Sequence, residues 1–123
     1  MEKMMSGRPH IAIIDSNTLA VLGLRQILQN VMSIIDVEAF GSLDEMKAYG
    51  PDSFFHYFVT VNVVLENRLF FMEHRHKTIV LTTSNDPSVQ LGDFHSLCIN
   101  VPENQLVRSI LMLLMLMAKI YHQ

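Results

Sequence analysis

Apolar residues along the chain form short runs, and these runs alternate with segments in which apolar positions recur every three or four residues. Four runs are nearly continuous, which is typical of parallel strands covered on both faces. They are HIAIID from residue 10, HYFVTVNVV from residue 56, TIVLTTS from residue 78 and SLCINV from residue 96. The run IIDVEAF from residue 34 alternates and also predicts a strand. We therefore predict five strands.

The segment from Asn17 to Val31 predicts an amphipathic helix. Val21, Leu24 and Leu28 recur at helical spacing, so they fall on one face that would pack on a sheet. Asn17 has a short polar side chain of the kind favoured at a helix N-cap. This helix follows the first strand almost without a loop.

Three further helices are predicted, together with one weak helical segment. SLDEMKAYG pairs Ser42 with Glu45 in capping-box spacing and ends in Gly50. LENRLFFMEHRHK, from residue 65, carries basic residues in its last turn, where they suit the helix dipole. The last helix opens at Pro102 and runs to residue 123. NDPSVQLGDF, from residue 85, predicts only one or two helical turns.

Strand and helix segments alternate along the whole chain with short connections. This order is the signature of an α/β protein with a doubly wound parallel sheet. Five such strands commonly take the flavodoxin-like order 2-1-3-4-5. We expect a flexible leader over residues 1–8 and one domain over residues 9–123, with a shortened fourth helix and a long apolar fifth helix. Whether an output domain follows residue 123 in a longer protein stays open.

Composition narrows the class of protein. The 123 residues are enough for one domain with its own core, and 50% are hydrophobic while only 17% are charged. A net charge of -3 without a basic block argues against direct nucleic-acid binding. The one cysteine, Cys98, excludes internal disulfides, fits a reducing compartment and is expected to be a small buried residue. The longest apolar run, residues 110–118, is too short to span a membrane, so we predict a soluble cytoplasmic protein.

Polar residues stand where the predicted strands end. Ligands of doubly wound sheets bind at these carboxyl ends. Asp15 and Ser16 follow the first strand, Asn62 lies near the end of the third, Thr82 ends the fourth and Asn100 ends the fifth. These five residues are the candidate site.

At these positions the chain resembles a response-regulator receiver domain, of the kind found with a helix-turn-helix output domain. The resemblance covers about residues 9–122 and is strongest in IAIIDSNTLAVLGLRQIL, KTIVLTTSNDP and INVPENQLVRSI. It implies a role in two-component signal transduction and transcription regulation, with a histidine kinase or an output domain as possible partners. Receivers hold Mg²⁺ with two acids after the first strand and accept a phosphoryl group on an Asp after the third. A Thr or Ser after the fourth strand and a Lys after the fifth bind the phosphoryl oxygens.

Carrying this pattern over residue by residue gives a degenerate phosphorylation pocket. The matched positions are Asp15, Ser16, Asn62 (or Val61), Thr82 and Asn100. Only the first acid and the hydroxyl residue keep the family's chemistry. Ser16 replaces the second acid, Asn62 replaces the acceptor and Asn100 replaces the Lys.

Physical chemistry agrees that these substitutions remove the reaction. One carboxylate makes Asp15 only a weak metal candidate, so we expect no cofactor and weak or lost Mg²⁺ binding. An Asn amide is not a nucleophile toward phosphate, and without Lys or metal nothing neutralises the transferring group. Glu66, the nearest downstream acid, is expected to face solvent on a helix. His74 and His76 are two residues apart, so they do not face each other on a helix and predict no metal site.

The last helix carries more apolar surface than docking on a sheet requires. From residue 106 to residue 117 it is apolar almost all round, whereas a docked helix needs one apolar stripe. Surplus apolar surface and methionines are typical of interaction sites. The predicted interface residues are Leu106, Ile110, Leu113, Leu114 and Met117. We expect a homodimer or a partner protein at this helix, with burial inside the chain as the alternative.

The leading hypothesis is a degenerate receiver, or pseudo-receiver, that signals by protein–protein interaction or dimerisation without ordinary aspartyl phosphorylation. It would not be an enzyme. The alternatives are a small-ligand sensor that uses the crevice at the strand ends and a receiver that is still phosphorylated.

Overall fold

The computed structural model describes residues 10–83 and 92–121, with side chains described as far as Leu116 in the last helix. The strands are β1 (His10–Ile14), β2 (Asp36–Phe40), β3 (His56–Thr60), β4 (Thr78–Thr82) and β5 (His95–Cys98). They form one five-stranded sheet in the order β2-β1-β3-β4-β5. The predicted α/β class and strand order are therefore confirmed. The predicted leader and most of the predicted fourth helical segment lie outside the described residues.

Two compact units divide the chain, Met1–Tyr57 and Phe58–Gln123. The helices of the first unit are α2 (Thr18–Val31), α3 (Leu43–Tyr49) and the 3-10 helix η1 (Pro51–Ser53). Those of the second are α4 (Val61–Glu66), α5 (Arg68–Glu73), the 3-10 helix η2 (Arg75–Lys77) and α6 (Glu103–Tyr121).

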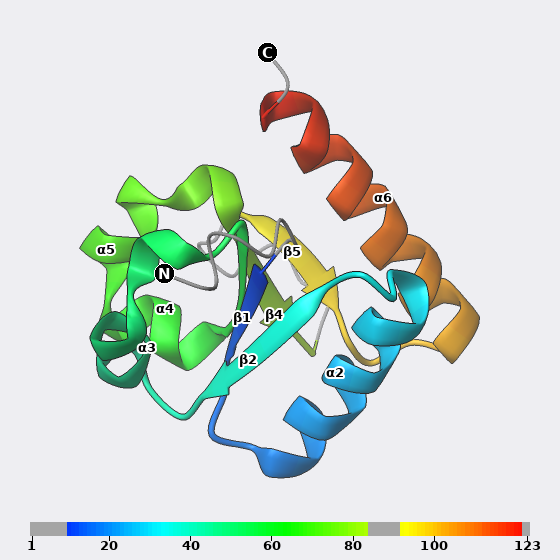
Figure 1. Cartoon of the computed structure of the whole chain (residues 1–123), viewed down its shortest axis with the longest axis horizontal. Coiled ribbons are helices and arrows are strands. Elements are labelled where there is room, and N and C mark those ends of the chain that lie inside the picture. The colour runs from blue at the N-terminus through cyan, green and yellow to red at the C-terminus, as the bar shows by residue number, and fades with distance from the viewer. Residues whose placement is uncertain (1–9, 84–91, 122–123) are drawn as a thin grey trace. The chain divides into compact units, whose positions relative to one another are not determined.

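In the first unit, β1 pairs in parallel with β2, and the register sets His10 opposite Asp36 and Ile14 opposite Phe40. All five residues of β1 are buried, as its continuous apolar sequence predicts. Helices α2 and α3 lie on opposite sides of this strand pair (Figure 1). The pair is therefore covered on both faces.

Aromatic rings from β1, β2, α3 and the segment before β3 pack together in the first unit. The ring centroid of Phe54 lies 4.9 Å from that of His10, 5.4 Å from that of Tyr49 and 5.8 Å from that of Phe40. Phe54 is 2% exposed, so this cluster is part of the core. Rings at such distances add packing energy to the area that they bury.

The cap of α3 departs in one detail from a capping box. Ser42 accepts a hydrogen bond from the backbone N–H of Glu45 at 3.3 Å, as predicted. The Glu45 carboxylate, however, accepts a hydrogen bond from the backbone N–H of Gly41 at 3.1 Å. In a capping box it would accept from the backbone N–H of Ser42. At the other end Gly50 has φ of +130°, a conformation that side chains rarely adopt.

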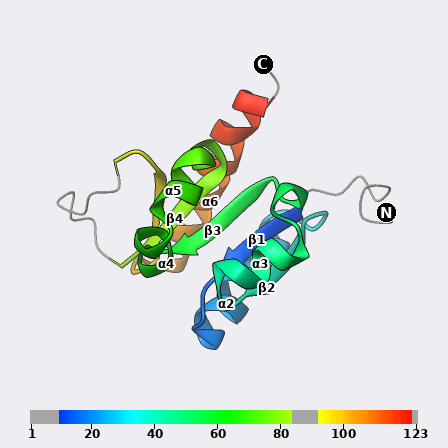
Figure 2. The ribbon, with the colours of Figure 1, turned by 90° about the vertical axis from the view of Figure 1, so that its left-hand side faces the viewer.

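The third strand is shorter than predicted, and the helix after it is divided. β3 ends at Thr60 instead of continuing through Val64, and α4 begins directly at its end, as Figure 2 shows. Three valines in VNVV favour a strand by propensity, but burial of Val64 against the fold overrides that preference. The predicted single helix over residues 65–77 is interrupted at Asn67, whose side chain donates to the carbonyl of Val63 at 2.9 Å.

In the second unit, β4 pairs in parallel with β5, with Ile79 opposite His95 and Thr82 opposite Cys98. β5 ends at Cys98 rather than Val101, and Cys98 is half-buried. Helices α4 and α5 lie on one side of this pair, and α6 lies on the other (Figure 1). Within the described residues, no helix is long and apolar enough to cross a membrane.

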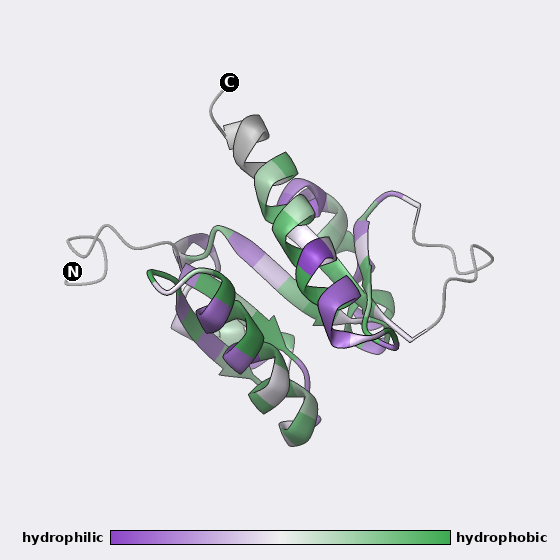
Figure 3. Cartoon of the chain, turned by 90° about the vertical axis from the view of Figure 1, so that its right-hand side faces the viewer, coloured by the Kyte–Doolittle hydropathy of each residue, from purple (hydrophilic) through white to green (hydrophobic). Residues whose placement is uncertain are grey.

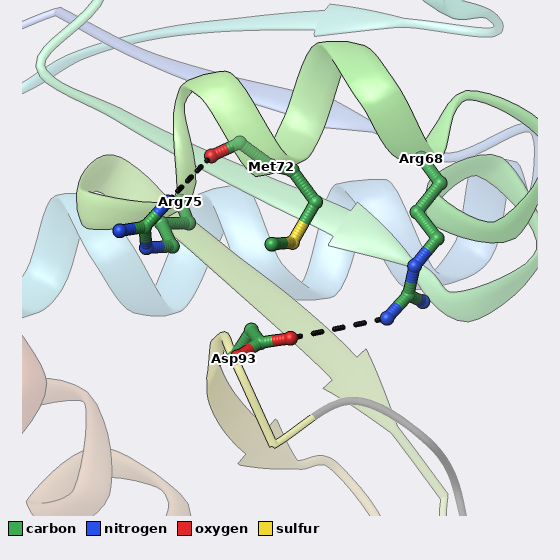
Figure 4. A network of polar contacts seen from close by, with 4 residues as sticks. All are labelled: Arg68, Met72, Arg75 and Asp93. Atoms are coloured by element: carbon green, nitrogen blue, oxygen red, sulfur yellow. Dashed lines mark hydrogen bonds and ion pairs between the residues drawn. The ribbon is translucent and has the colours of Figure 1, made fainter.

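A polar network joins α5 to the segment before β5 (Figure 4). The guanidinium of Arg68 lies 3.9 Å from the carboxylate of Asp93. Arg75 donates to the backbone carbonyl of Met72 at 3.3 Å, which satisfies a carbonyl at the C-terminal end of α5. Both side chains of the ion pair are largely exposed, so the pair contributes little to stability.

Candidate functional site

Asp15 lies directly after β1 and is half-buried. Its carboxylate accepts a hydrogen bond from the backbone N–H of Asn17 at 2.9 Å. Asn17 in turn accepts from the N–H of Ala20 at 3.1 Å and caps α2, as predicted. The backbone N–H of Asp15 donates to the carbonyl of Phe40 at 2.9 Å. Asp15 therefore organises the turn between β1 and α2.

Ser16 is the exposed residue between Asp15 and the cap of α2. A second carboxylate at this position would place two ionised groups next to each other, and a bound cation would offset their repulsion. The hydroxyl of Ser16 carries no charge, so it neither repels the carboxylate of Asp15 nor favours a bound cation.

Asn62 is the second residue of α4 and is exposed. It stands on a helix rather than at a strand end, because β3 stops at Thr60. Val61, the alternative match to the acceptor, is the first residue of the same helix and is half-buried. Neither side chain carries a carboxylate. Glu66, the nearest downstream acid, is exposed at the last position of α4, as predicted.

Thr82 is the last residue of β4 and is half-buried. Its hydroxyl donates to the carbonyl of Leu97 on the neighbouring strand at 3.4 Å, which is a long hydrogen bond. Its own carbonyl accepts from the N–H of Ile99 at 2.8 Å and extends the pairing of β4 with β5. Asn100 is exposed in the loop between β5 and α6.

The predicted pocket residues are therefore shared between the two units. Asp15 and Ser16 belong to the first unit, whereas Asn62, Thr82 and Asn100 belong to the second. Each of the two retained polar side chains, Asp15 and Thr82, has a main-chain partner within its own unit. Among the described residues there is no group of three or more His, Cys, Asp or Glu side chains that could hold a metal ion.

The histidines at the end of α5 are placed by packing. One ring nitrogen of His74 lies 2.7 Å from the carbonyl of Phe70, and the His74 ring stacks on the Phe70 ring with centroids 4.2 Å apart. Burial and then the nearby charge of Lys77 lower the pKa of His76 below its ordinary value of 6.5. His74 and Arg75 lower it further.

Helix α6 presents different apolar residues from those predicted. Ile110 and Leu114 are buried within the chain, with 0% and 7% of their surface exposed, so they are not available to a partner. Leu106 and Leu113 are half-buried, and the side chain of Met117 lies outside the description. Among the described side chains of this helix, the exposed large apolar residues form what we call the α6 patch, which consists of Leu111, Met112, Met115 and Leu116.

The α6 patch borders a hollow between the helix and β5. Its volume is about 490 Å³, and it is lined by Ser96, Ser109, Met112, Leu113, Met115 and Leu116. Figure 3 shows hydrophilic residues on the first turns of α6 and mainly hydrophobic ones on the turns that follow. The sequence missed these residues because a helix that is apolar all round gives no contrast by which to assign its faces.

Comparisons with known proteins identify the fold. No protein-family model and no curated protein matches the sequence. Among solved structures, the chain is similar to RcsB from Salmonella enterica serovar Typhimurium, determined bound to promoter rprA in the presence of phosphomimetic BeF3-. The two share 16% identity with a TM-score of 0.68, and the match covers 94% of this chain and 67% of RcsB. This similarity agrees with the receiver-like fold that the sequence predicts.

Proposed function

We propose that this chain is a degenerate receiver domain of a transcriptional response regulator, which acts by associating with a second copy of itself and not by aspartyl phosphorylation. The observation that carries the proposal is the chemistry of Asn62. The residue matched to the phosphoryl acceptor is an exposed amide on a helix, and an amide cannot form the acyl phosphate.

The hydrogen bonds of the two retained polar residues support the same proposal. Asp15 accepts from the N–H of Asn17, and Thr82 donates to the carbonyl of Leu97. Bonds of this kind stabilise a turn and a strand pair, and they explain why both side chains are useful without bound Mg²⁺. Under this proposal the domain is a cytoplasmic signalling module without a cofactor and is not an enzyme.

Association through the α6 patch is supported by its exposure and its lack of charge. Met112 and Met115 are each 65% exposed, and no charged residue occurs between Arg108 and Lys119. A second copy that presents the same face would therefore meet no like charge, and a two-fold interface is self-complementary by construction. Burying such apolar side chains is the main driving force of association.

Phosphorylation is tested by incubating the domain with Mg²⁺ and either acetyl phosphate or beryllofluoride. Intact mass and amide chemical shifts are recorded, and an authentic receiver serves as the positive control. We expect no added phosphoryl group and no shift changes around Asp15. A stoichiometric acyl phosphate would contradict the proposal and would favour a receiver that is still phosphorylated.

Association is tested by sedimentation at micromolar concentrations. We expect a mass above the 14.1 kDa of one chain for the wild-type domain and a monomer for Leu116→Glu. Leu69→Glu is the matched control, because Leu69 is an 83% exposed leucine on α5, on the other side of the β4–β5 pair. A wild-type monomer, or equal effects of the two substitutions, would contradict association through α6.

A further inference from the structure

Two methionines of the α6 patch are placed for chemical modification. Met112 and Met115 are three residues apart on α6, so they are neighbours on the helix surface. Both line the hollow against β5, and each has 65% of its surface exposed. Their thioether sulfurs are the most oxidisable groups of an otherwise hydrocarbon surface.

Burial distinguishes these two methionines from the others whose side chains are described. Met46 has 0% exposure in the core of the first unit. Met32 and Met72 are half-buried. Among these described methionines, a small oxidant in solution therefore reaches Met112 and Met115 first, and it leaves the core residue Met46 intact while the domain stays folded.

We propose that Met112 and Met115 form a peroxide-sensitive modification site that controls association through the α6 patch. This inference rests on the proposed function, since it concerns the same surface. Each thioether sulfur attacks one oxygen of hydrogen peroxide, and an S–O bond forms as the O–O bond breaks. The sulfur is oxidised to a sulfoxide by two electrons, while the peroxide is reduced and leaves as water. A sulfoxide reductase reverses the change with electrons from a thiol.

Oxidation changes the patch in the direction that opposes association. A sulfoxide oxygen is a strong hydrogen-bond acceptor, and among the described residues that line the hollow only Ser96 and Ser109 have a side-chain donor. Burying the oxidised patch against a second copy leaves acceptors without partners. Association and oxidation therefore exclude each other, and a high protein concentration slows oxidation of both residues.

The experiment compares three versions of this 123-residue chain before and after treatment with hydrogen peroxide. The first is the wild type. The second carries Met112→Leu and Met115→Leu, which keep the apolar volume but cannot be oxidised. The third carries Met112→Gln and Met115→Gln, which place a polar group of similar length at both positions. Sedimentation gives the dissociation constant, and peptide mass spectrometry with fragmentation counts the oxygens on each methionine.

We expect peroxide to add one oxygen to Met112 and one to Met115 before any to Met46. The wild-type dissociation constant should rise by at least about tenfold, which corresponds to about 1.4 kcal/mol. The leucine variant should remain associated after treatment, and the glutamine variant should be monomeric without it. Circular dichroism should show that all three proteins keep their fold.

The possible failures can be told apart. If the dimer carries both oxygens and its dissociation constant is unchanged, oxidation does not regulate association and this inference is wrong. The proposed association itself would not be contradicted. Equal oxidation of Met46 and Met112 overturns the selectivity. A wild-type protein that is monomeric before treatment overturns the proposed association and its control together.

Discussion

Ile110 offers a sharp test of which face of α6 packs on the protein. It has no exposed surface, and Leu114 lies one turn later on the same face with 7% exposure. The sequence alone had placed both residues in an interface with a partner. Because Ile110 is buried within the chain, Ile110→Ala removes core packing and has no direct effect on association.

The expected cost of Ile110→Ala follows from its burial. The substitution removes three carbon atoms, each worth about 0.8 kcal/mol when buried, or about 2.4 kcal/mol together. The cavity left behind raises the expected loss of stability to about 3–4 kcal/mol. The better helix propensity of Ala offsets a few tenths of a kcal/mol of this loss. At about 4 °C per kcal/mol for a chain of this size, the midpoint of thermal unfolding should fall by about 12 °C.

The assay is urea unfolding of the wild type, Ile110→Ala and the control Met112→Ala, each followed by circular dichroism at a protein concentration below the dissociation constant of the proposed dimer, so that association does not contribute to the measured stability. Met112 is 65% exposed, so only about a third of its side chain is removed from water on folding. Its truncation should therefore lower the free energy of unfolding by less than about 1 kcal/mol. Both substitutions lie on the same helix and introduce the same residue. Propensity and unfolded-state effects are therefore similar, and the difference reports burial.

Equal losses of stability for the two variants would refute the reasoning, and so would a loss below about 1 kcal/mol for Ile110→Ala. Either result would mean that α6 packs on the domain through another face. The α6 patch and both proposals that rest on it would then have to be abandoned.

Three further predictions concern the first unit and the end of α5. Asp15→Ala should lower the free energy of unfolding by about 1 kcal/mol, whereas Asp15→Asn, which can still accept from Asn17, should be nearly neutral in the same urea assay. Gly50→Ala should cost about 1 kcal/mol or more in thermal unfolding, because Gly50 has φ of +130°; an unchanged midpoint would argue against this conformation. The pKa of His76 is lowered on folding, so the unfolded chain binds its proton more tightly and stability should fall as the pH drops through and below 6.5. NMR titration should give a midpoint below that value, and His76→Gln should weaken the loss of stability in acid.

The sequence by itself determined the five strands, the caps of two helices and the order of these elements along the chain. Continuous apolar runs at β1 and β4 identify buried parallel strands, and Asn17 and Ser42 cap the helices at the residues that local chemistry selects. These features depend on neighbours within a few residues. For that reason they can be read without knowing the fold, and the alternation of strand and helix leaves few topologies to choose from.

Only the tertiary structure decided where β3 ends and which face of α6 is covered. The valines after Thr60 suit a strand by propensity, yet they lie in α4, where Val64 is fully buried. In α6, leucines and methionines occupy every face, so periodicity could not separate the buried Ile110 from the exposed Met112. Burial is set by contacts between residues far apart in the sequence, and a local pattern contains that information only when polar residues mark the other face.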